Sequence, residues 1–157
     1  MRHQAKTLVE LLKARGLTCA TAESCTGGGV GSAITSVPGS SAVFYGGVIS
    51  YDNSVKENVL GVASDTRATV GAVSSDCAAQ MAAGARRLLQ TDLAVSLTGI
   101  AGPDGGSAEK PVGLVWFGLA TADGVRTEKA IFPGDREEVR RHAILHALGM
   151  LTTAALT

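Results

Sequence analysis

The chain has 157 residues and 45% of them are hydrophobic, which is enough to bury the core of one domain spanning residues 1–157. Lys plus Arg and Asp plus Glu both number 14, and the resulting zero net charge argues against nucleic-acid binding. The three cysteines form no C-x-x-C pair, which excludes a disulfide framework and a cysteine zinc site and favours a reducing compartment. Neither a signal-peptide pattern nor a membrane-length apolar run occurs, so we expect a cytoplasmic protein that does not bind membranes.

The first half of the chain alternates between helical and strand patterns. Leucines and alanines at helical spacing predict a helix over residues 2–15, which Gly16 ends. Short apolar runs predict strands over residues 17–22 and 43–51. We expect Thr26 to cap the helix that lies between these two strands.

The second half is expected to hold two helices, a strand, a hairpin and a last helix. Ser54 and Ser74 are suited to cap the first two helices, because a serine hydroxyl accepts hydrogen bonds from free backbone N–H groups. The turn Ala122-Asp123-Gly124 predicts the hairpin. The expected elements are helices over 54–60 and 74–90, strands over 92–99, 114–121 and 125–132, and a helix that starts near Asp135.

The order of these elements predicts the fold class. Helical crossovers join the first three strands, which should therefore be parallel, whereas the hairpin forces one strand to run the other way. We expect an α/β protein, namely a three-layer α/β/α sandwich whose five-stranded mixed sheet contains one antiparallel strand.

Polar residues follow each of the three parallel strands. Residues 23–26 (ESCT) end the first strand, residues 50–53 (SYDN) end the second with Lys56 one turn later, and Thr98-Gly99 ends the third. Ligands of open α/β sheets bind beyond the carboxyl ends of the parallel strands. The three segments together therefore predict a site at this edge, although a simple turn would explain each of them singly.

The segment TAESCTGGG, residues 21–29, joins the first strand to the next helix. It lacks the lysine of a P-loop and the last glycine of a G-x-G-x-x-G motif. N–H groups at a helix N-terminus could still bind an anion or an oxyanion, which makes Thr26, Gly27 and Gly28 candidates for substrate binding. The alternative is that the glycines only allow the helix to pack closely on the strand.

The same turn offers two nucleophiles, Ser24 and Cys25. No histidine is well placed as the base, and the two histidines of the last helix lack the glutamate of H-E-x-x-H, so no metal site is expected. Lys56 remains as a candidate base, because a lysine that is partly desolvated beside Tyr51 can lose its proton near neutral pH. The alternatives are a solvated helix position for Lys56 and a small buried hydrophobe for Cys25.

The segment TGIAGPDGGSAEKPVG, residues 98–113, is long and rich in glycine. Loops of this length in compact domains are usually functional or disordered. Thr98, Gly99 and Gly102 are therefore candidates for ligand contact. Arg136 precedes the last helix, and its planar guanidinium suits a phosphate group, with a solvated helix face as the alternative.

Several segments together resemble the CinA C-terminal domain family. They are TAESCTGG, GGVISYDNSVKENVLGV, GAVS, DLAVSLTGIAGPDGGSAEKPVG and FPGDREEVRRHAI, and the resemblance runs from about residue 5 to residue 152. The family includes stand-alone deamidases, so the resemblance implies a bacterial amidohydrolase that converts nicotinamide mononucleotide and water to nicotinate mononucleotide and ammonia. It further implies an α/β/α sandwich, a cytoplasmic location, a homodimer and a small nucleotide substrate. Neither a cofactor nor a metal ion is expected.

The resemblance also implies roles for individual residues. Ser24 of AESCTGG, with Tyr51 and Lys56 of the Y-x-N-x-x-K segment, corresponds to catalytic positions. Ser41, Thr98 and Arg136 also correspond to site positions. With the candidates from the residues themselves, the full set expected to bind substrate is Thr26, Gly27, Gly28, Ser41, Asn53, Thr98, Gly99, Gly102 and Arg136. The larger CinA proteins carry an additional N-terminal domain, and the activity of that domain is not carried over.

The expected mechanism has Ser24 attacking the carboxamide carbon while Lys56, with Tyr51 beside it, transfers the proton. Backbone N–H groups near residues 24–28, or Thr98, would hold the oxyanion. Arg136 and N–H groups of the glycine loop would hold the 5′-phosphate. Two alternatives stay open: lysine and tyrosine activate water directly, or the chain is a non-catalytic nucleotide-binding or regulatory module.

Overall fold

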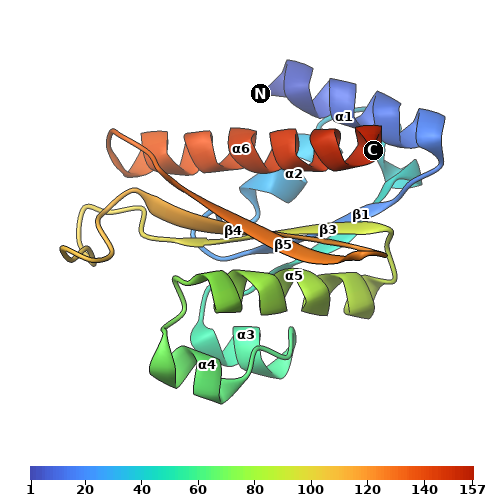
Figure 1. The fold of residues 1–157 in the computed structure, drawn as a ribbon. Helices are drawn as coiled ribbons and strands as arrows, with labels where there is room; N and C mark the ends of the chain where they lie inside the picture. The colour runs from blue at the N-terminus through green and yellow to red at the C-terminus, as the bar shows by residue number, and fades with distance from the viewer.

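The computed structural model describes residues 1–157, and Figure 1 shows a central sheet between two layers of helices. The helices are α1 (Arg2–Arg15), α2 (Gly29–Thr35), α3 (Asn53–Asn58), α4 (Ser64–Thr69), α5 (Ser75–Leu89) and α6 (Arg136–Leu156), with a 3-10 turn η1 (Ser40–Ala42). The strands are β1 (Cys19–Glu23), β2 (Phe44–Ile49), β3 (Leu93–Gly99), β4 (Leu114–Thr121) and β5 (Gly124–Ile131). None of the helices is both long and apolar enough to cross a membrane.

The strands lie in the order β2-β1-β3-β4-β5 across the sheet. Strand β1 pairs in parallel with β2 on one side and with β3 on the other. Strand β4 is antiparallel to both of its neighbours, so it alone runs against the other strands. The expected fold class, an α/β/α sandwich with a mixed five-stranded sheet and one antiparallel strand, is confirmed.

Each face of the sheet has its own hydrophobic core. In Figure 1, α1, α2 and α6 lie on one side of the sheet, and α5 lies on the other side with α3 and α4 beyond it. The larger core contains Leu8, Val95 and Leu148, whereas the smaller core contains Ala94 and Met81. Strand β3 contributes to both cores, which explains its nearly continuous apolar sequence.

The helix starts differ from expectation at two places, and one helix was not expected. Helix α2 begins after Gly28 rather than at a Thr26 cap, and α3 is capped by Asp52, which accepts from the Ser54 N–H at 3.0 Å. Helix α4 buries none of its residues, so the sequence carries no apolar period to reveal it. The expected Ser74 cap of α5 and Asp135 start of α6 are confirmed.

The register of the parallel strands brings three polar positions to one edge of the sheet. Glu23 lies opposite both Ile49 of β2 and Leu97 of β3. The residues that follow these three, Ser24, Ser50 and Thr98, therefore lie at the same edge. A site at the carboxyl ends of the strands is thus a direct consequence of the pairing.

Helix α5 lies against the segment that follows α3 too closely to admit a side chain at the contact. A Cβ atom at Gly84 would overlap the carbonyl oxygen of Leu60. Because this neighbour is backbone, it cannot turn aside as a side chain could. Gly149, inside α6, has no heavy atom within 4 Å of the place where a Cβ would lie, so it serves as a matched control.

We predict that Gly84→Ala lowers the free energy of unfolding by about 2 kcal/mol, since the added methyl group forces α5 away from Leu60. Gly149→Ala is expected to raise it by up to about 1 kcal/mol, because alanine favours a helix. Urea unfolding followed by circular dichroism measures both values. Equal stabilities for the two variants would contradict the close contact.

Candidate active site

A cleft of about 290 Å³ opens at the carboxyl ends of β1, β2 and β3. Its lining combines small apolar residues with hydroxyl, amide and basic groups. The lining residues are Ser24, Cys25, Tyr51, Asn53, Lys56, Ala72, Val73, Thr98, Gly99, Ala101 and Arg136. The lining contains the guanidinium group of Arg136 and no carboxylate, so the cleft is suited to an anionic ligand.

Ser24 lies at the centre of the contacts in this cleft. It directly follows β1, and its N–H continues the ladder by donating to the Leu97 carbonyl at 3.0 Å. Its hydroxyl oxygen lies 2.9 Å from the Nζ atom of Lys56, and the residue is 8% exposed. The backbone therefore fixes Ser24, and the only basic group in contact with its hydroxyl is a lysine.

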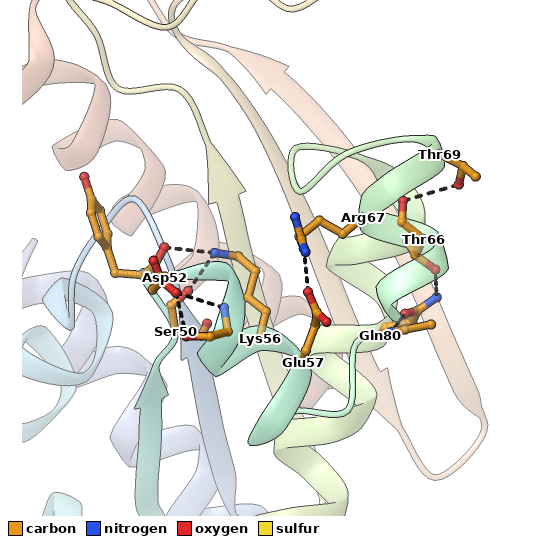
Figure 2. A network of polar contacts seen from close by, with 11 residues as sticks. Ser50, Asp52, Lys56, Glu57, Thr66, Arg67, Thr69 and Gln80 are labelled. Atoms are coloured by element: carbon orange, nitrogen blue, oxygen red, sulfur yellow. Dashed lines mark hydrogen bonds and ion pairs between the residues drawn. The ribbon is translucent and has the colours of Figure 1, made fainter.

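Lys56 is almost completely buried, with 2% of its surface exposed. Its Nζ atom donates to the carbonyl oxygens of Ser50 at 2.7 Å and Tyr51 at 3.2 Å. Figure 2 shows the side chain extending from α3 toward Ser50. None of the ion pairs in the structure includes Lys56. Burial accordingly lowers the pKa of this amine from its ordinary value, because desolvation penalises the charged form.

The three contacts of Lys56 fit an ammonium group, which would donate in all three, and they also fit a neutral amine. Two N–H groups can donate to the carbonyls of Ser50 and Tyr51, which leaves one lone pair to accept the Ser24 hydroxyl proton. A serine beside such an amine has a base within hydrogen-bond reach. The arrangement can therefore generate a nucleophilic alkoxide without a histidine.

The helix that carries Lys56 is held from its outer side. Figure 2 shows Glu57 directed toward Arg67 of α4, with which it forms an ion pair, while Gln80 of α5 donates to Thr66 at 2.8 Å. These contacts join α3 to α4 and α4 to α5. Helix α4, which the sequence did not predict, thus helps to hold in place the helix that carries Lys56.

Cys25, the rival nucleophile, is chemically unreactive in this environment. Burial raises the pKa of its thiol to about 11, so the thiolate is scarce at neutral pH. The residue is 7% exposed, which agrees with the alternative of a small buried hydrophobe. Ser24 is therefore the better nucleophile of the two.

Tyr51 and Arg136 form the outer wall of the cleft. The Tyr51 residue is 62% exposed, and its hydroxyl accepts from Arg136 Nη2 at 3.4 Å. Arg136 also donates through Nη1 to the carbonyl of Gly102 at 2.8 Å, which ties α6 to the glycine-rich loop. The hydrogen bond between Tyr51 and Lys56 is made by the Tyr51 backbone carbonyl, and no hydrogen bond joins their two side chains.

The expectation of free N–H groups at the start of α2 is wrong. The buried carboxylate of Glu23 accepts from the N–H groups of Val30 at 2.8 Å and Gly31 at 3.0 Å. It also accepts from the Thr26 hydroxyl at 2.6 Å. An anionic ligand would therefore meet a carboxylate here instead of open donors. Thr26, Gly27 and Gly28 lie outside the cleft lining, and their expected contact with substrate stays a prediction.

Arg140 holds the same turn from the other side. Its Nε donates to the Cys25 carbonyl and its Nη2 to the Thr26 carbonyl, both at 3.1 Å. The spacing of four residues places it one turn after Arg136 on α6. Nothing in the sequence around Arg140 indicates these contacts, which only the tertiary structure reveals. Together, Glu23 and Arg140 fix the turn that presents Ser24.

The other expected site residues divide between the cleft and its surroundings. Asn53, Thr98 and Gly99 line the cleft, and Gly102 borders it through its bond to Arg136. Ser41 lies in η1, before β2 begins, and so at the opposite edge of the sheet. It is not brought together with the other candidates within this chain.

Three lining residues were missed by sequence reasoning. Ala72 and Val73 precede α5, and Ala101 lies in the glycine-rich loop; as small apolar residues they carry no chemical signal. Lys110 of that loop donates to the Val70 carbonyl at 2.6 Å and thereby holds the loop against the segment that contains Ala72 and Val73. Figure 1 shows the loop, in yellow and gold, extending past the end of the sheet.

The chain belongs to the CinA C-terminal domain family, whose profile matches residues 1–155. A nicotinamide-nucleotide amidohydrolase, PncC, from Escherichia coli K12 is 52% identical over 143 residues, which cover 90% of this chain and 87% of that protein. The crystal structure of the competence/damage inducible protein CihA from Agrobacterium tumefaciens superposes with a TM-score of 0.95 at 42% identity, covering 99% of this chain and 95% of that one.

Other relatives are much longer than this chain. A CinA-like protein of Cyanothece is 50% identical over 155 residues, which cover 98% of this chain and 37% of that protein. Relatives from Halothermothrix orenii and Caldanaerobacter subterraneus are 58% and 50% identical, and the match covers 32% and 35% of their lengths. The chain thus spans about a third of the length of these relatives.

We predict that Lys56→Met stabilises the fold most at low pH. The Lys56 amine has a lower pKa in the folded chain than in the unfolded chain. At any pH between these two pKa values the unfolded chain binds more protons, so the stability of the wild type rises with pH across this interval. The advantage of the variant should therefore shrink between pH 6 and pH 10, by about 1.4 kcal/mol for each unit of lowering. Urea unfolding across this range measures it, with the exposed Lys6→Met as the control. Parallel pH curves for wild type and Lys56→Met would contradict the buried, perturbed amine.

Proposed function

We propose that this chain is an amidohydrolase that converts nicotinamide mononucleotide and water to nicotinate mononucleotide and ammonia, a reaction of pyridine nucleotide salvage. The observation that carries the proposal is the 2.9 Å contact between the Ser24 hydroxyl and the buried amine of Lys56. The 52% identity to the nicotinamide-nucleotide amidohydrolase of Escherichia coli supports the choice of substrate. The basic cleft agrees with a phosphorylated ligand.

The reaction begins when neutral Lys56 accepts the Ser24 proton and the serine oxygen attacks the carboxamide carbon. The C–N bond then breaks, and the proton held by Lys56 passes to the nitrogen, which leaves as ammonia. The nicotinoyl group remains as an ester on Ser24. Water, deprotonated by Lys56, attacks this ester, and the same proton returns to the serine oxygen as nicotinate mononucleotide leaves.

The backbone N–H of Cys25 is our proposed donor to the oxyanion. It belongs to the residue after the nucleophile, it borders the cleft, and it donates to no backbone carbonyl. The Glu23 and Arg140 contacts hold this peptide in place before substrate arrives. A donor that is fixed in advance stabilises developing charge without reorganisation during the reaction.

Arg136 is our proposed anchor for the 5′-phosphate at the mouth of the cleft. Its bonds to Gly102 and Tyr51 use two of the five guanidinium N–H groups and leave the rest available. Asn53, in the first turn of α3, offers an amide for the ribose or phosphate. Tyr51 then acts as part of the binding wall, while Lys56 alone transfers protons.

We predict that Ser24→Ala lowers ammonia release from nicotinamide mononucleotide at least about a thousandfold, because the nucleophile is lost. Ser36→Ala, at an exposed serine that bonds to the carbonyl of Ala33, should keep wild-type activity. Glutamate-dehydrogenase-coupled ammonia assays measure the rates, with nicotinamide and glutamine as control substrates. Hydroxylamine should trap the acyl-enzyme as the hydroxamate.

Two other outcomes would redirect the proposal. Full activity in Ser24→Ala, with no hydroxamate formed by the wild type, would favour direct activation of water by lysine and tyrosine. Thermal stabilisation by the nucleotide without any ammonia release would favour a non-catalytic nucleotide-binding or regulatory module.

We further propose that residues 1–157 act as one cytoplasmic domain that pairs as a homodimer through strand β2. This strand forms an edge of the sheet, and Tyr45 and Ile49 on it are each 58% exposed. Tyr51 continues the apolar stripe toward the cleft. Edge strands that expose large apolar residues favour association.

The homodimer proposal predicts that Ile49→Lys produces a monomer in light scattering after gel filtration. Ile131, on the opposite edge strand β5, is 61% exposed and provides the matched control, since Ile131→Lys should leave the dimer intact. A wild-type protein that elutes as a monomer at micromolar concentration would overturn the homodimer proposal.

A further inference from the structure

We infer that Thr98 makes this site selective for a carboxamide over the corresponding carboxylate, because its hydroxyl can only accept a hydrogen bond from the ligand. The inference rests on the proposed function and adds a specificity-determining residue to it. It concerns the discrimination between substrate and product, which differ at a single polar group.

The hydroxyl proton of Thr98 is already in use inside the protein. Its Oγ1 donates to the carbonyl oxygen of Ala72 at 2.9 Å, and the residue is 1% exposed. A carbonyl oxygen can only accept, so the direction of this bond is fixed by chemistry. A hydroxyl carries a single hydrogen, so only oxygen lone pairs remain to face the cleft that Thr98 lines.

The sheet register places these lone pairs beside the nucleophile. Glu23 lies opposite Leu97, and the Ser24 N–H donates to the Leu97 carbonyl, so Ser24 and Thr98 are the next neighbours along the two parallel strands. Side chains of neighbouring positions project from the same face of a sheet, with Cβ atoms about 5 Å apart. A carbonyl carbon attacked by Ser24 therefore has one of its substituents next to Thr98 Oγ1.

A carboxamide and a carboxylate behave differently at that position. The amide NH₂ group supplies a hydrogen to the Thr98 lone pair, whereas a carboxylate has only acceptor oxygens and meets the lone pair without a hydrogen between them. The hydroxyl could rotate to serve the carboxylate only by leaving the Ala72 carbonyl without its bond. Thr98 thus favours the substrate and weakens the hold on the product.

This geometry also changes the role expected for Thr98 in the reaction. A hydroxyl whose proton is committed to Ala72 cannot donate to an oxyanion, so Thr98 instead turns the NH₂ group toward itself. The amide oxygen is then directed away from Thr98, toward the other side of the attacked carbon. The leaving nitrogen is in this way fixed before the C–N bond breaks.

The test measures dissociation constants by calorimetry in a Ser24→Ala background, where no turnover occurs. The probes are nicotinamide mononucleotide, nicotinate mononucleotide and 3-acetylpyridine mononucleotide, whose methyl ketone has the shape of the amide without its hydrogens. With Thr98 present, the amide should bind about tenfold or more tightly than either of the other two. Adding Thr98→Val should reduce this preference to within about twofold, while Thr98→Ser should retain it.

A structural effect of Thr98→Val would weaken all three ligands equally and would leave the ratios unchanged, which would overturn the inference. Equal binding of the amide and the ketone with Thr98 present would overturn it without any Thr98 variant, so a misfolded variant does not decide the question. Ammonia release by the wild-type protein is assayed separately. Its absence would remove the proposed function, whereas active protein with unchanged binding ratios would remove only the role of Thr98.

Discussion

The structure depends on the burial of one amine without a carboxylate partner. Lys56 is packed beneath the cleft with two backbone carbonyls and one serine hydroxyl as its polar contacts. Burial favours the neutral form of such a lysine because desolvation penalises its charge, whereas an ion pair would keep it charged. Burial of Lys56 therefore costs folding stability while it makes the amine a better base at neutral pH. The contacts that join α3 to α4 and α4 to α5 hold the amine in this buried position, where it is not hydrated.

The cleft also requires that the carboxyl ends of β1, β2 and β3 lie at the same edge of the sheet. Parallel pairing of β1 with β2 and β3 sets Ser24, Ser50 and Thr98 side by side, so three segments distant in sequence supply the proposed nucleophile, a lysine-binding carbonyl and the proposed ligand acceptor. Helix α6 adds a fourth segment through two arginines one turn apart. Arg136 reaches the wall and the loop, while Arg140 reaches the turn. The antiparallel strand β4 lies between β3 and β5 and contributes no residue to the lining of the cleft.

The layers, the sheet and most element boundaries follow from the sequence because apolar periodicity and turn residues are local signals. Ser24, Lys56 and Thr98 were also predictable, since polar residues that follow parallel strands gather at one edge, whereas Arg136 was indicated by its guanidinium group and by the family resemblance. The occupied start of α2 was not predictable, because nothing local indicates that the Glu23 side chain folds back onto the glycines that follow it. Helix α4 and the contacts of Arg140 likewise depend on tertiary packing, which leaves no pattern in their own segments.

The buried state of Cys25 has a consequence for the chemistry of oxidation. Reactive oxygen species attack thiolates, and a thiol whose pKa is about 11 is ionised in only about one molecule in ten thousand at pH 7. Cys19 and Cys77 are buried as well, and burial also raises the pKa of each of their thiols. A reactive sulfur atom next to Ser24 would make the turn vulnerable to peroxide. The low thiolate fraction of Cys25 instead makes the turn that presents Ser24 a poor target for peroxide.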